Sequence, residues 1–262
     1  MQINSPSNSL LNKTTQASNK QNEQLATGKR VNSAADDAAA LQIINRLTSQ
    51  QEGYGQSIRN AYDGISYSQT SESALSGVGD AVSRIRELSI QAGNGALTDS
   101  DRQALQDEVA QLQTQITDTF ENTTFGGAPL FDGQQANFQV GPDANTTQSF
   151  TQADSSVAAG ILSVDISTQA GAQAAITAAD QVAKDVNTQR SQLGAFENTL
   201  NSTIRGLGNQ SDRIAESQSR IADTDFAQVA AQRSANDILS QASIALRGQA
   251  NQSASSVLNL LQ

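Results

Sequence analysis

The chain has 262 residues, of which 37% are hydrophobic, 4% are aromatic and 16% are charged, and its net charge is −10. It contains no Cys, no His and no Trp, whereas Gln alone occurs 33 times. The lack of cysteine excludes disulfides and thiolate metal sites, and the lack of histidine removes the commonest acid–base group and zinc ligand. Because phosphate binding needs basic patches, the negative charge also argues against a nucleic-acid partner.

The two ends of the chain are almost uncharged. Residues 1–22 hold only Lys13 and Lys20, and residues 238–262 hold only Arg247, so the 26 acids and 13 bases between them sum to −13. The low apolar content of the ends favours disorder in a free monomer. The C-terminal end nevertheless carries a helical apolar stripe, which predicts a helix in a complex: Ile238, Leu239, Ala242, Leu246, Ala250, Val257, Leu258 and Leu261.

Neither a cleaved signal peptide nor a membrane span is expected. The N-terminus lacks a basic segment followed by an apolar run, and the apolar stretches are far shorter than the ~20 residues that a bilayer span needs. If the chain is exported, we expect a route without a cleaved signal.

The first long helix is predicted over residues 41–91. A seven-residue repeat runs through Leu47, Tyr54, Ala61, Leu75 and Val82, with Ser68 as its weak member. A second apolar seam fills the alternate positions, at Ile44, Ile58, Ile65, Val78 and Ile85. Such paired seams are typical of a helix that packs along a partner helix.

Another helical segment is predicted over Asp99–Phe120. Its apolar residues step by three or four positions, and Thr98 or Ser100 can cap it. Between residues 122 and 168 the period changes, and Gly-Gly, Asp-Gly and Gly-Pro pairs signal turns. Alternation at Phe138 and Val140, and at Leu162, Val164 and Ile166, predicts short β-hairpins.

The strongest repeat predicts a helix over residues 172–221. Its heptad positions are unbroken: Ala179, Val186, Leu193, Leu200, Leu207, Ile214 and Ile221. Such a helix would be about 75 Å long, more than a small domain can enclose. The predicted fold is therefore mainly α: an elongated helical bundle or coiled-coil rod with a small β-hairpin region.

No residue pattern indicates catalysis, a cofactor or a metal. Asp36 and Asp37 invite an acid–base or metal reading, but Asp at a helix start ordinarily accepts backbone N–H groups. Asp223, Asp225 and Asp237 are interpreted in the same way, as caps or surface charges. The Gly77–Gly79 segment is too short for a phosphate loop and no Gly-Lys-Ser follows.

Several sequence blocks closely resemble the bacterial flagellins. They are residues 27–39 (TGKRVNSAADDAA), 60–66 (NAYDGIS), 84–91 (RIRELSIQ), 220–227 (RIADTDFA), 249–252 (QANQ) and 257–261 (VLNLL). The blocks stand in the family's order at both ends and frame nearly the whole chain. Departures include Gln24–Gly28, where relatives usually carry Arg-Leu-Ser-Ser-Gly, and Pro6, which a helix tolerates only in its first turn.

The resemblance implies two domains and a function. Residues 1–37 and 223–262 would form an inner domain of paired terminal helices, and residues 38–222 a surrounding rod domain with the hairpin region at about 122–168. The variable outer domains of many relatives have no counterpart, so the chain is expected to be a short flagellin. It would be exported by the type III flagellar route and polymerise outside the cell into the helical filament used for swimming.

The resemblance also implies partners. An export chaperone, the hook-junction proteins and the cap protein are expected by analogy, and Leu239, Leu246, Val257, Leu258 and Leu261 are the predicted polymerisation seam. In relatives the segment that matches 84–91 is bound by vertebrate Toll-like receptor 5. Carried over by position, this points to a patch of Arg84, Leu88 and Glu108, with Arg84 and Leu88 exposed.

One alternative is a relative in the same superfamily, and two belong to other classes. A hook–filament junction protein would share both end regions, but typically matches the Asn-Ser-Ala-x-Asp-Asp block less regularly. A secreted enzyme on the same frame would need an inserted domain with a metal motif, and the chain has neither an insert nor a histidine. A free coiled-coil adhesin or effector would not polymerise when seeded.

Overall fold

The computed structural model describes residues 5–260, which form two compact units. Unit 1 comprises Met1–Gln51 with Asp212–Gln262, and unit 2 comprises Glu52–Ser211. The division falls within the two longest helices, α2 (Ala38–Ala92) and α5 (Gln169–Ala222). The expected long helices at 41–91 and 172–221 are thus confirmed, each a few residues longer than predicted.

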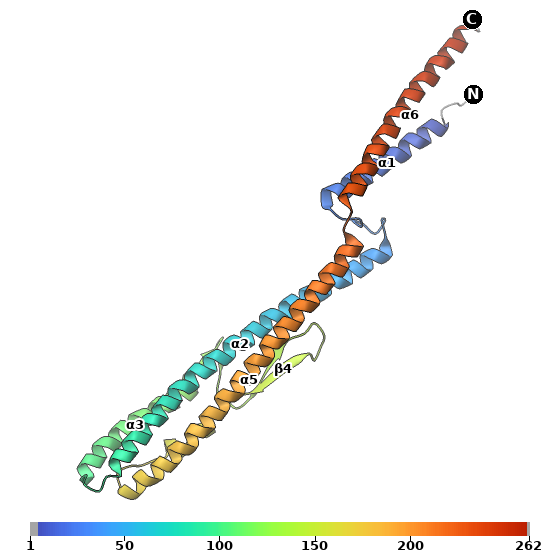
Figure 1. Ribbon diagram of the computed structural model, residues 1–262. Coiled ribbons are helices and arrows are strands. Elements are labelled where there is room, and N and C mark those ends of the chain that lie inside the picture. Colours follow the sequence, from blue (N-terminus) through green and yellow to red (C-terminus); the bar gives the residue numbers. More distant parts are fainter. Residues whose placement is uncertain (1–4, 261–262) are drawn as a thin grey trace. The chain divides into compact units, whose positions relative to one another are not determined.

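Unit 1 contains the two terminal helices, α1 (Ser5–Thr27) and α6 (Phe226–Leu260), which run antiparallel side by side (Figure 1). Pro6 lies in the first turn of α1, where its missing N–H is not needed. Both ends have the helical state expected for a complex. A small apolar cluster of Val31, Ala40, Ile44 and Ala222 packs where the ends of α2 and α5 meet the connecting segments.

Unit 2 is built on the antiparallel pair of α2 and α5, with α3 (Asp99–Asn122) beside them (Figure 1). The heptad positions of α5 lie in its core: Ala179, Val186, Leu193, Leu200 and Leu207 are all buried. Ala179, Val186 and Leu193 pack in one cluster with the buried Leu75, Val78, Val82 and Ile85 of α2, and Leu200 packs in a second cluster with Ala61 of α2. These two clusters lie along the apolar seam that the seven-residue repeats predict.

Two small antiparallel sheets cover one side of the helices. The pair β1 (Thr124–Phe125) and β2 (Ala128–Pro129) is joined by Gly126 and Gly127, whose φ angles of 61° and 87° favour glycine. The pair β3 (Gln135–Gln139) and β4 (Thr147–Thr151) has the register Gln135↔Thr151 to Gln139↔Thr147. Phe138 and Phe150 pack against Phe196 of α5, with ring centroids 5.8 and 5.4 Å apart. The predicted hairpin region is confirmed at these two places.

The strand expected at Leu162–Ile166 is wrong. This stretch follows a 3₁₀ turn, η1 (Ser155–Ala158), and a single helical turn, α4 (Ala159–Leu162). Its backbone groups bond to side chains of α3: Gln113 donates to the carbonyl oxygens of Ile161 and Val164, both at 2.9 Å. Gln106 accepts from the Ile166 N–H at 2.7 Å. Because glutamine side chains satisfy these groups, the alternating segment needs no strand partner.

Candidate functional site

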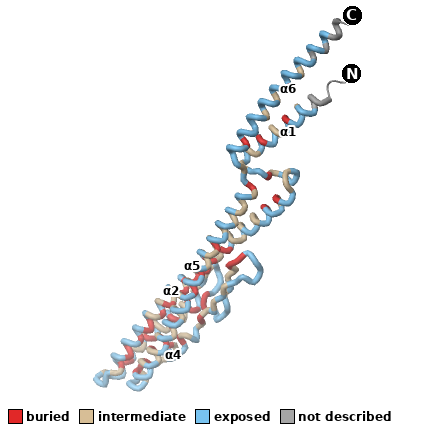
Figure 2. Tube along the Cα trace, turned by 45° about the vertical axis from the view of Figure 1, so that its right-hand side comes forward, coloured by how far each residue is buried: buried red, intermediate tan, exposed pale blue. Residues whose placement is uncertain are grey.

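The apolar stripe of α6 does not pack on α1. Leu239 is 52% exposed and Leu246 is 68% exposed, and their neighbour Ile238 is also exposed. Most of the coloured part of α6 is accordingly pale blue, the colour of exposed residues, in Figure 2. These residues are therefore not on the face of α6 that packs against the N-terminal helix α1. The side chains of Val257 and Leu258, and the whole of Leu261, lie outside the described residues.

The face that α6 turns to α1 is mostly polar. Within it Val229 and Ser243 are buried, and the Asn236 amide donates to Oε1 of Gln21 on α1 at 3.0 Å. On α1 the buried residues are Thr14 and Gln21. A helix pair joined by hydroxyl and amide groups leaves the larger apolar side chains of α6 outside, on a different face.

Exposed apolar side chains gather on α6 more than on other helices of the described residues. Ile238, Leu239, Ile244 and Leu246 are each more than half exposed, as is Phe226 at the start of the helix. Single exposed apolar residues are ordinary, but a contiguous group marks an association surface. Ile238, Leu239, Ala242 and Leu246 share one side of the helix at helical spacing, so together they form a stripe that none of the described residues of unit 1 covers.

The segment that joins α1 to α2 is hydrogen-bonded to the segment that joins α5 to α6. The Arg30 N–H donates to the Ala222 carbonyl at 2.6 Å, and the Thr224 N–H donates to the Gly28 carbonyl at 3.0 Å. The Arg30 guanidinium also donates to the Ile221 carbonyl, at the C-terminal end of α5. Gly28 has a φ of 70°, which favours glycine there.

Asp36 and Asp37 have the structural roles that the sequence favours. The Asp36 carboxylate lies 2.8 Å from the Lys20 ammonium of α1 and accepts from the N–H groups of Asn32 and Ser33. The bond from Lys20, and then these backbone bonds, lower the pKa of Asp36 to about 2. Asp37 caps α2 by accepting from the Ala40 N–H at 2.9 Å.

The other singled-out carboxylates also serve as caps or surface partners. Asp225 caps α6 through the N–H groups of Ala227 and Gln228. Asp223 accepts from the Ser219 hydroxyl, and Asp237 accepts from the Ser18 hydroxyl of α1. No three carboxylates of the described residues come together as a group that would hold a metal ion.

Arg84 and Glu108 come together as predicted, but Leu88 does not join them. The Arg84 guanidinium donates to Glu108 of α3 at 2.8 Å and to Glu87 at 3.1 Å. These hydrogen bonds raise the pKa of Arg84. Leu88 is 1% exposed and lies in the core of unit 2, so the expectation that it is exposed is wrong.

Glu87 was not part of the predicted patch, although its position three residues after Arg84 is a spacing at which side chains on a helix form ion pairs. The exposed patch is therefore composed of Arg84, Glu87 and Glu108. Leu88 lies beneath it and holds α2 against the core.

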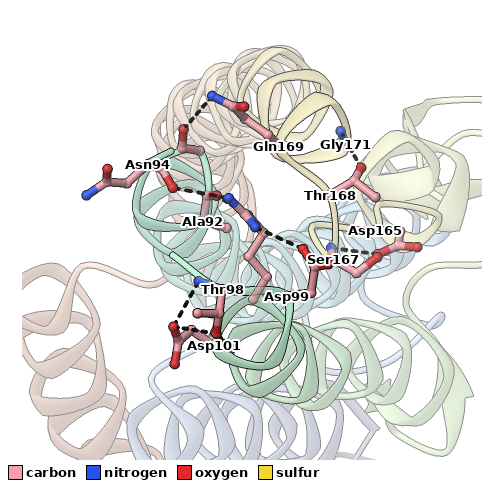
Figure 3. A network of polar contacts seen from close by, with 12 residues as sticks. Ala92, Asn94, Thr98, Asp99, Asp101, Asp165, Ser167, Thr168, Gln169 and Gly171 are labelled. Carbon is pink, nitrogen blue, oxygen red and sulfur yellow. Dashed lines mark hydrogen bonds and ion pairs between the residues drawn. The ribbon is translucent and has the colours of Figure 1, made fainter. Parts of the chain in front are cut away.

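A network of polar contacts closes one end of unit 2, where α2 ends and α3 and α5 begin (Figure 3). The buried Arg102 donates to the Ala92 and Asn94 carbonyl oxygens at 3.0 and 3.3 Å. Thr98 caps α3 in a capping box with Asp101, as expected. Gln169 at the start of α5 donates to the Gly93 carbonyl at 3.2 Å. These bonds fix α3 beside α2, which places Glu108 next to Arg84.

None of the helices within the described residues has an apolar stretch long enough to cross a bilayer.

Residues 2–136 match the bacterial flagellin N-terminal helical region, and residues 176–261 match the bacterial flagellin C-terminal helical region. The chain is 38% identical to a flagellin of Halalkalibacterium halodurans over 245 residues, covering 92% of this chain and 90% of that one. It is 35% identical to a flagellin of Bacillus subtilis, with 94% and 93% covered. It is 34% identical to the flagellar filament 31.3 kDa core protein of Treponema maltophilum, with 98% and 96% covered.

Two solved structures are similar in fold. The crystal structure of Bacillus cereus flagellin has a TM-score of 0.52 and 25% identity, covering 57% of this chain and 88% of that one. A putative flagellar hook-associated protein from Vibrio parahaemolyticus has a TM-score of 0.63, covering 72% and 100%. Its identity of 16% shows a shared fold alone.

Proposed function

The chain belongs to the bacterial flagellin family, and we propose that it polymerises through the exposed apolar stripe of α6. As a short-form flagellin it is a structural subunit of the extracellular flagellar filament and not an enzyme. The alternative of a hook–filament junction protein has only a fold-level likeness behind it.

The observation that carries the proposal is the exposure of Leu239 and Leu246 on a helix whose other face is already engaged with α1. Burying two such leucines between copies gains about 1.5–3 kcal/mol for each fully buried side chain. Around this stripe the helix is nearly uncharged, since Arg247 is the one charged residue from 238 to 262. Packing then requires little desolvation of charge, which costs several kcal/mol per ion.

We extend the seam to Val257, Leu258 and Leu261, the large apolar residues that follow the stripe towards the C-terminus. Residues 1–37 and 223–262 would form the inner domain in the filament, and residues 38–222 the rod domain. The connecting segments at Gly28–Arg30 and Ala222–Thr224 support a boundary of this kind, because the chain passes from α1 to α2 and from α5 to α6 through these two segments, which are hydrogen-bonded to each other. A contact that repeats by rotation and translation without closing gives an open helical filament.

A matched pair of substitutions tests the stripe. Leu246→Asp places a charge on it, whereas Gln241→Asp places the same charge on an exposed position of α6 outside both the stripe and the α1 face. We expect Leu246→Asp to abolish seeded polymerisation, measured by pelleting and electron microscopy, with helicity unchanged by circular dichroism. Gln241→Asp should polymerise nearly as well as wild type. Long filaments from the Leu246→Asp chain would exclude the stripe as the seam.

The same stripe gives a reason for an export chaperone. An apolar helix face that stays exposed in the monomer is an aggregation liability until assembly. We propose that a chaperone covers it before export and that the hook-junction and cap proteins contact it at the two filament ends. Leu239→Asp should therefore weaken chaperone binding and polymerisation together, while Gln241→Asp should weaken neither.

We further propose that Arg84 and Glu108 form part of a surface for Toll-like receptor 5, with Glu87 as a third member and Leu88 as the buried support. An exposed arginine held by two carboxylates has the composition of an interface hot spot. Arg84→Ala should weaken binding of monomer to the receptor by at least about tenfold. Lys184→Ala, at an exposed base of α5, is the control for loss of charge alone. Equal receptor affinities for the two variants would exclude the patch.

A further inference from the structure

The charges of unit 2 are unevenly distributed. Residues 52–211 hold 18 acids and 7 bases, a net charge of −11, whereas the remaining residues hold 8 acids and 9 bases. Within unit 2, residues 99–168 hold ten acids and a single base, Arg102. Arg102 is buried and paired with Asp99, so it offers nothing to a neighbour. Two copies that approach with this acidic α3 and hairpin surface repel each other.

The outer face of α2 from Ser66 to Ser76, in contrast, is nearly uncharged. Over residues 64–79 the one charged residue is Glu72, which lies 3.4 Å from the Arg190 guanidinium of α5. The residues exposed on this face carry hydroxyl and amide groups, and Ser66, Gln69 and Ser73 are the most exposed of them. Such groups exchange hydrogen bonds with a partner at far less desolvation cost than unpaired carboxylates.

Two adjoining hollows flank this face. One, of about 570 Å³, lies between α2 and the end of α3 and is lined by Ser66, Gln69, Thr70, Ser73, Ala74 and Thr123. The other, of about 330 Å³, lies on the α5 side and is lined by Gln69, Glu72, Ser73, Ser76 and Arg190. Gln69 and Ser73 belong to both, so they form a low ridge between two depressions.

Polar groups without partners lie beside the second hollow. The Nε of Arg190, which lines it, and the side-chain oxygens Oε1 of Gln189 and Glu197 are buried without a hydrogen-bond partner among the described residues. Burial, and then the nearby Glu72, raise the pKa of Glu197. Buried polar groups are normally paired, and these three are not within the described part of the chain.

We infer that the Ser66–Ser76 face of α2, with its two flanking hollows, is a docking surface for a second copy of this chain. The inference rests on the polymerisation of this flagellin and deepens it by assigning a contact in unit 2. A second copy is the occupant because a polymer must bring copies of unit 2 together despite their charge of −11 each. They can meet on the face that carries no unpaired charge and turn the acidic surface of residues 99–168 to solvent.

The absence of cysteine from the chain allows a direct test. Ser73→Cys provides a single thiol on the ridge, and Gln111→Cys provides one on the exposed side of α3. We expect the rate of maleimide labelling of Ser73→Cys to fall at least about tenfold from monomer to filament, whereas Gln111→Cys labels at similar rates in both. A benzophenone probe on Ser73→Cys should cross-link copies into dimers within filaments. Equal labelling of Ser73→Cys in monomer and filament would overturn the inference.

Assembly kinetics supply a second readout. Ser73→Arg places a long charged side chain between the two hollows, and Gln111→Arg adds the same side chain to the acidic surface. Seeded elongation of Ser73→Arg should slow at least about tenfold, since a charge would then be desolvated at the contact. Gln111→Arg should elongate as wild type, and both monomers should melt like wild type. Normal elongation of Ser73→Arg would contradict the docking surface.

Failure of the α2 docking surface can be distinguished from failure of the proposed α6 seam. If Leu246→Asp still polymerises, the apolar stripe is excluded as the seam, but protection of Ser73→Cys within those filaments still decides the α2 contact. If Leu246→Asp fails as expected and Ser73→Cys stays fully reactive in wild-type filaments, the α6 stripe holds and the α2 face is excluded.

Discussion

The two antiparallel helix pairs of this flagellin differ in what holds them together. The α2–α5 pair of unit 2 has a largely apolar seam, in which Leu75, Val82, Leu193 and Leu200 are buried. The α1–α6 pair has hydroxyl and amide contacts instead, and it leaves Leu239 and Leu246 exposed. The first pair therefore buries its apolar side chains within one chain, whereas the second leaves the larger apolar side chains of α6 exposed for the proposed contacts with other copies.

This difference matches the two requirements of an exported filament subunit. A stable unit 2 keeps the monomer structured, while weakly joined terminal helices keep assembly dependent on neighbours. Ordering a helix residue costs about 1–2 kcal/mol of conformational entropy, and polar contacts of α1 with α6 offset little of it. In the proposed seam, burial of the α6 stripe in the polymer would supply the remainder and make polymerisation cooperative.

The largest expected effect is from a charge in the unit 2 seam. Leu200 is fully buried, so Leu200→Asp should lower the free energy of unfolding by about 3–5 kcal/mol. Leu207→Asp, also in the seam, should act in the same direction. Gln192→Ala, at an exposed position of α5, should change it by less than about 0.5 kcal/mol. Urea unfolding followed by circular dichroism measures all three, and equal midpoints would mean that the seam does not hold unit 2 together.

Removal of residues 240–262 should separate the two helix pairs by function. Unit 2 lies wholly outside the deleted segment, so its melting transition should be retained. Leu246 and the rest of the stripe beyond residue 239 are lost, so seeded polymerisation should be abolished. Differential scanning calorimetry and pelleting measure the two halves of this prediction. Filaments from the truncated chain would show that α6 is not needed for association.

The sequence predicts the long helices well because their heptads are long and unbroken. The repeat from Ala179 to Ile221 predicts α5 to within three residues at its start and one at its end, and Thr98 is the observed cap of α3. The segment from Leu162 to Ile166 misleads because its alternation is real but its backbone partners are the side chains of Gln106 and Gln113. Those bonds join residues 60 and 48 positions apart and leave no local pattern.

The candidate surfaces were less predictable than the helices. Periodicity groups Leu239 with Leu246 on one face of α6, but it cannot tell whether α1 or another copy covers that face. Arg84 and Leu88 are four residues apart and were expected to share an exposed face, yet α3 packs along the side of α2 where Leu88 lies. Which side of a helix is covered depends on where its neighbours are placed, and this depends in part on Arg102, whose buried bonds hold the start of α3 beside α2.

Substitutions at two glycines of α2 should change the stability of unit 2 by smaller amounts and in opposite directions. A Cβ on Gly64 would lie 2.9 Å from Cδ1 of Leu200 and 3.3 Å from the Phe138 ring, whereas a Cβ on Gly77 would meet nothing within 4 Å. Gly64→Ala should therefore destabilise unit 2 by about 1–3 kcal/mol. Gly77→Ala should stabilise it by about 0.5–1 kcal/mol through helix propensity. Thermal unfolding of the two variants measures both signs, and a destabilised Gly77→Ala chain would mean that its side of α2 is closely packed.

The smallest expected effect is a pH dependence confined to unit 1. The pKa of Asp36 is lowered to about 2 from 3.8, so its contribution to folding is fully present above pH 4 and is lost as the pH falls towards 2. Its carboxylate joins Lys20 of α1 to the N–H groups of Asn32 and Ser33, so its protonation should loosen the segment between α1 and α2. Hydrogen exchange between pH 4 and pH 2, corrected for the intrinsic exchange rate, should show falling protection of these amides in the wild-type chain. In Asp36→Asn the same amides should already be weakly protected at pH 4 and should change little below it, because the substituted side chain does not titrate.

Since other carboxylates titrate in this range, the buried α5 amides near Leu193 serve as the internal reference for general acid effects. An Asp36→Asn chain whose connecting segment loses protection in parallel with wild type would assign the acid sensitivity to another group.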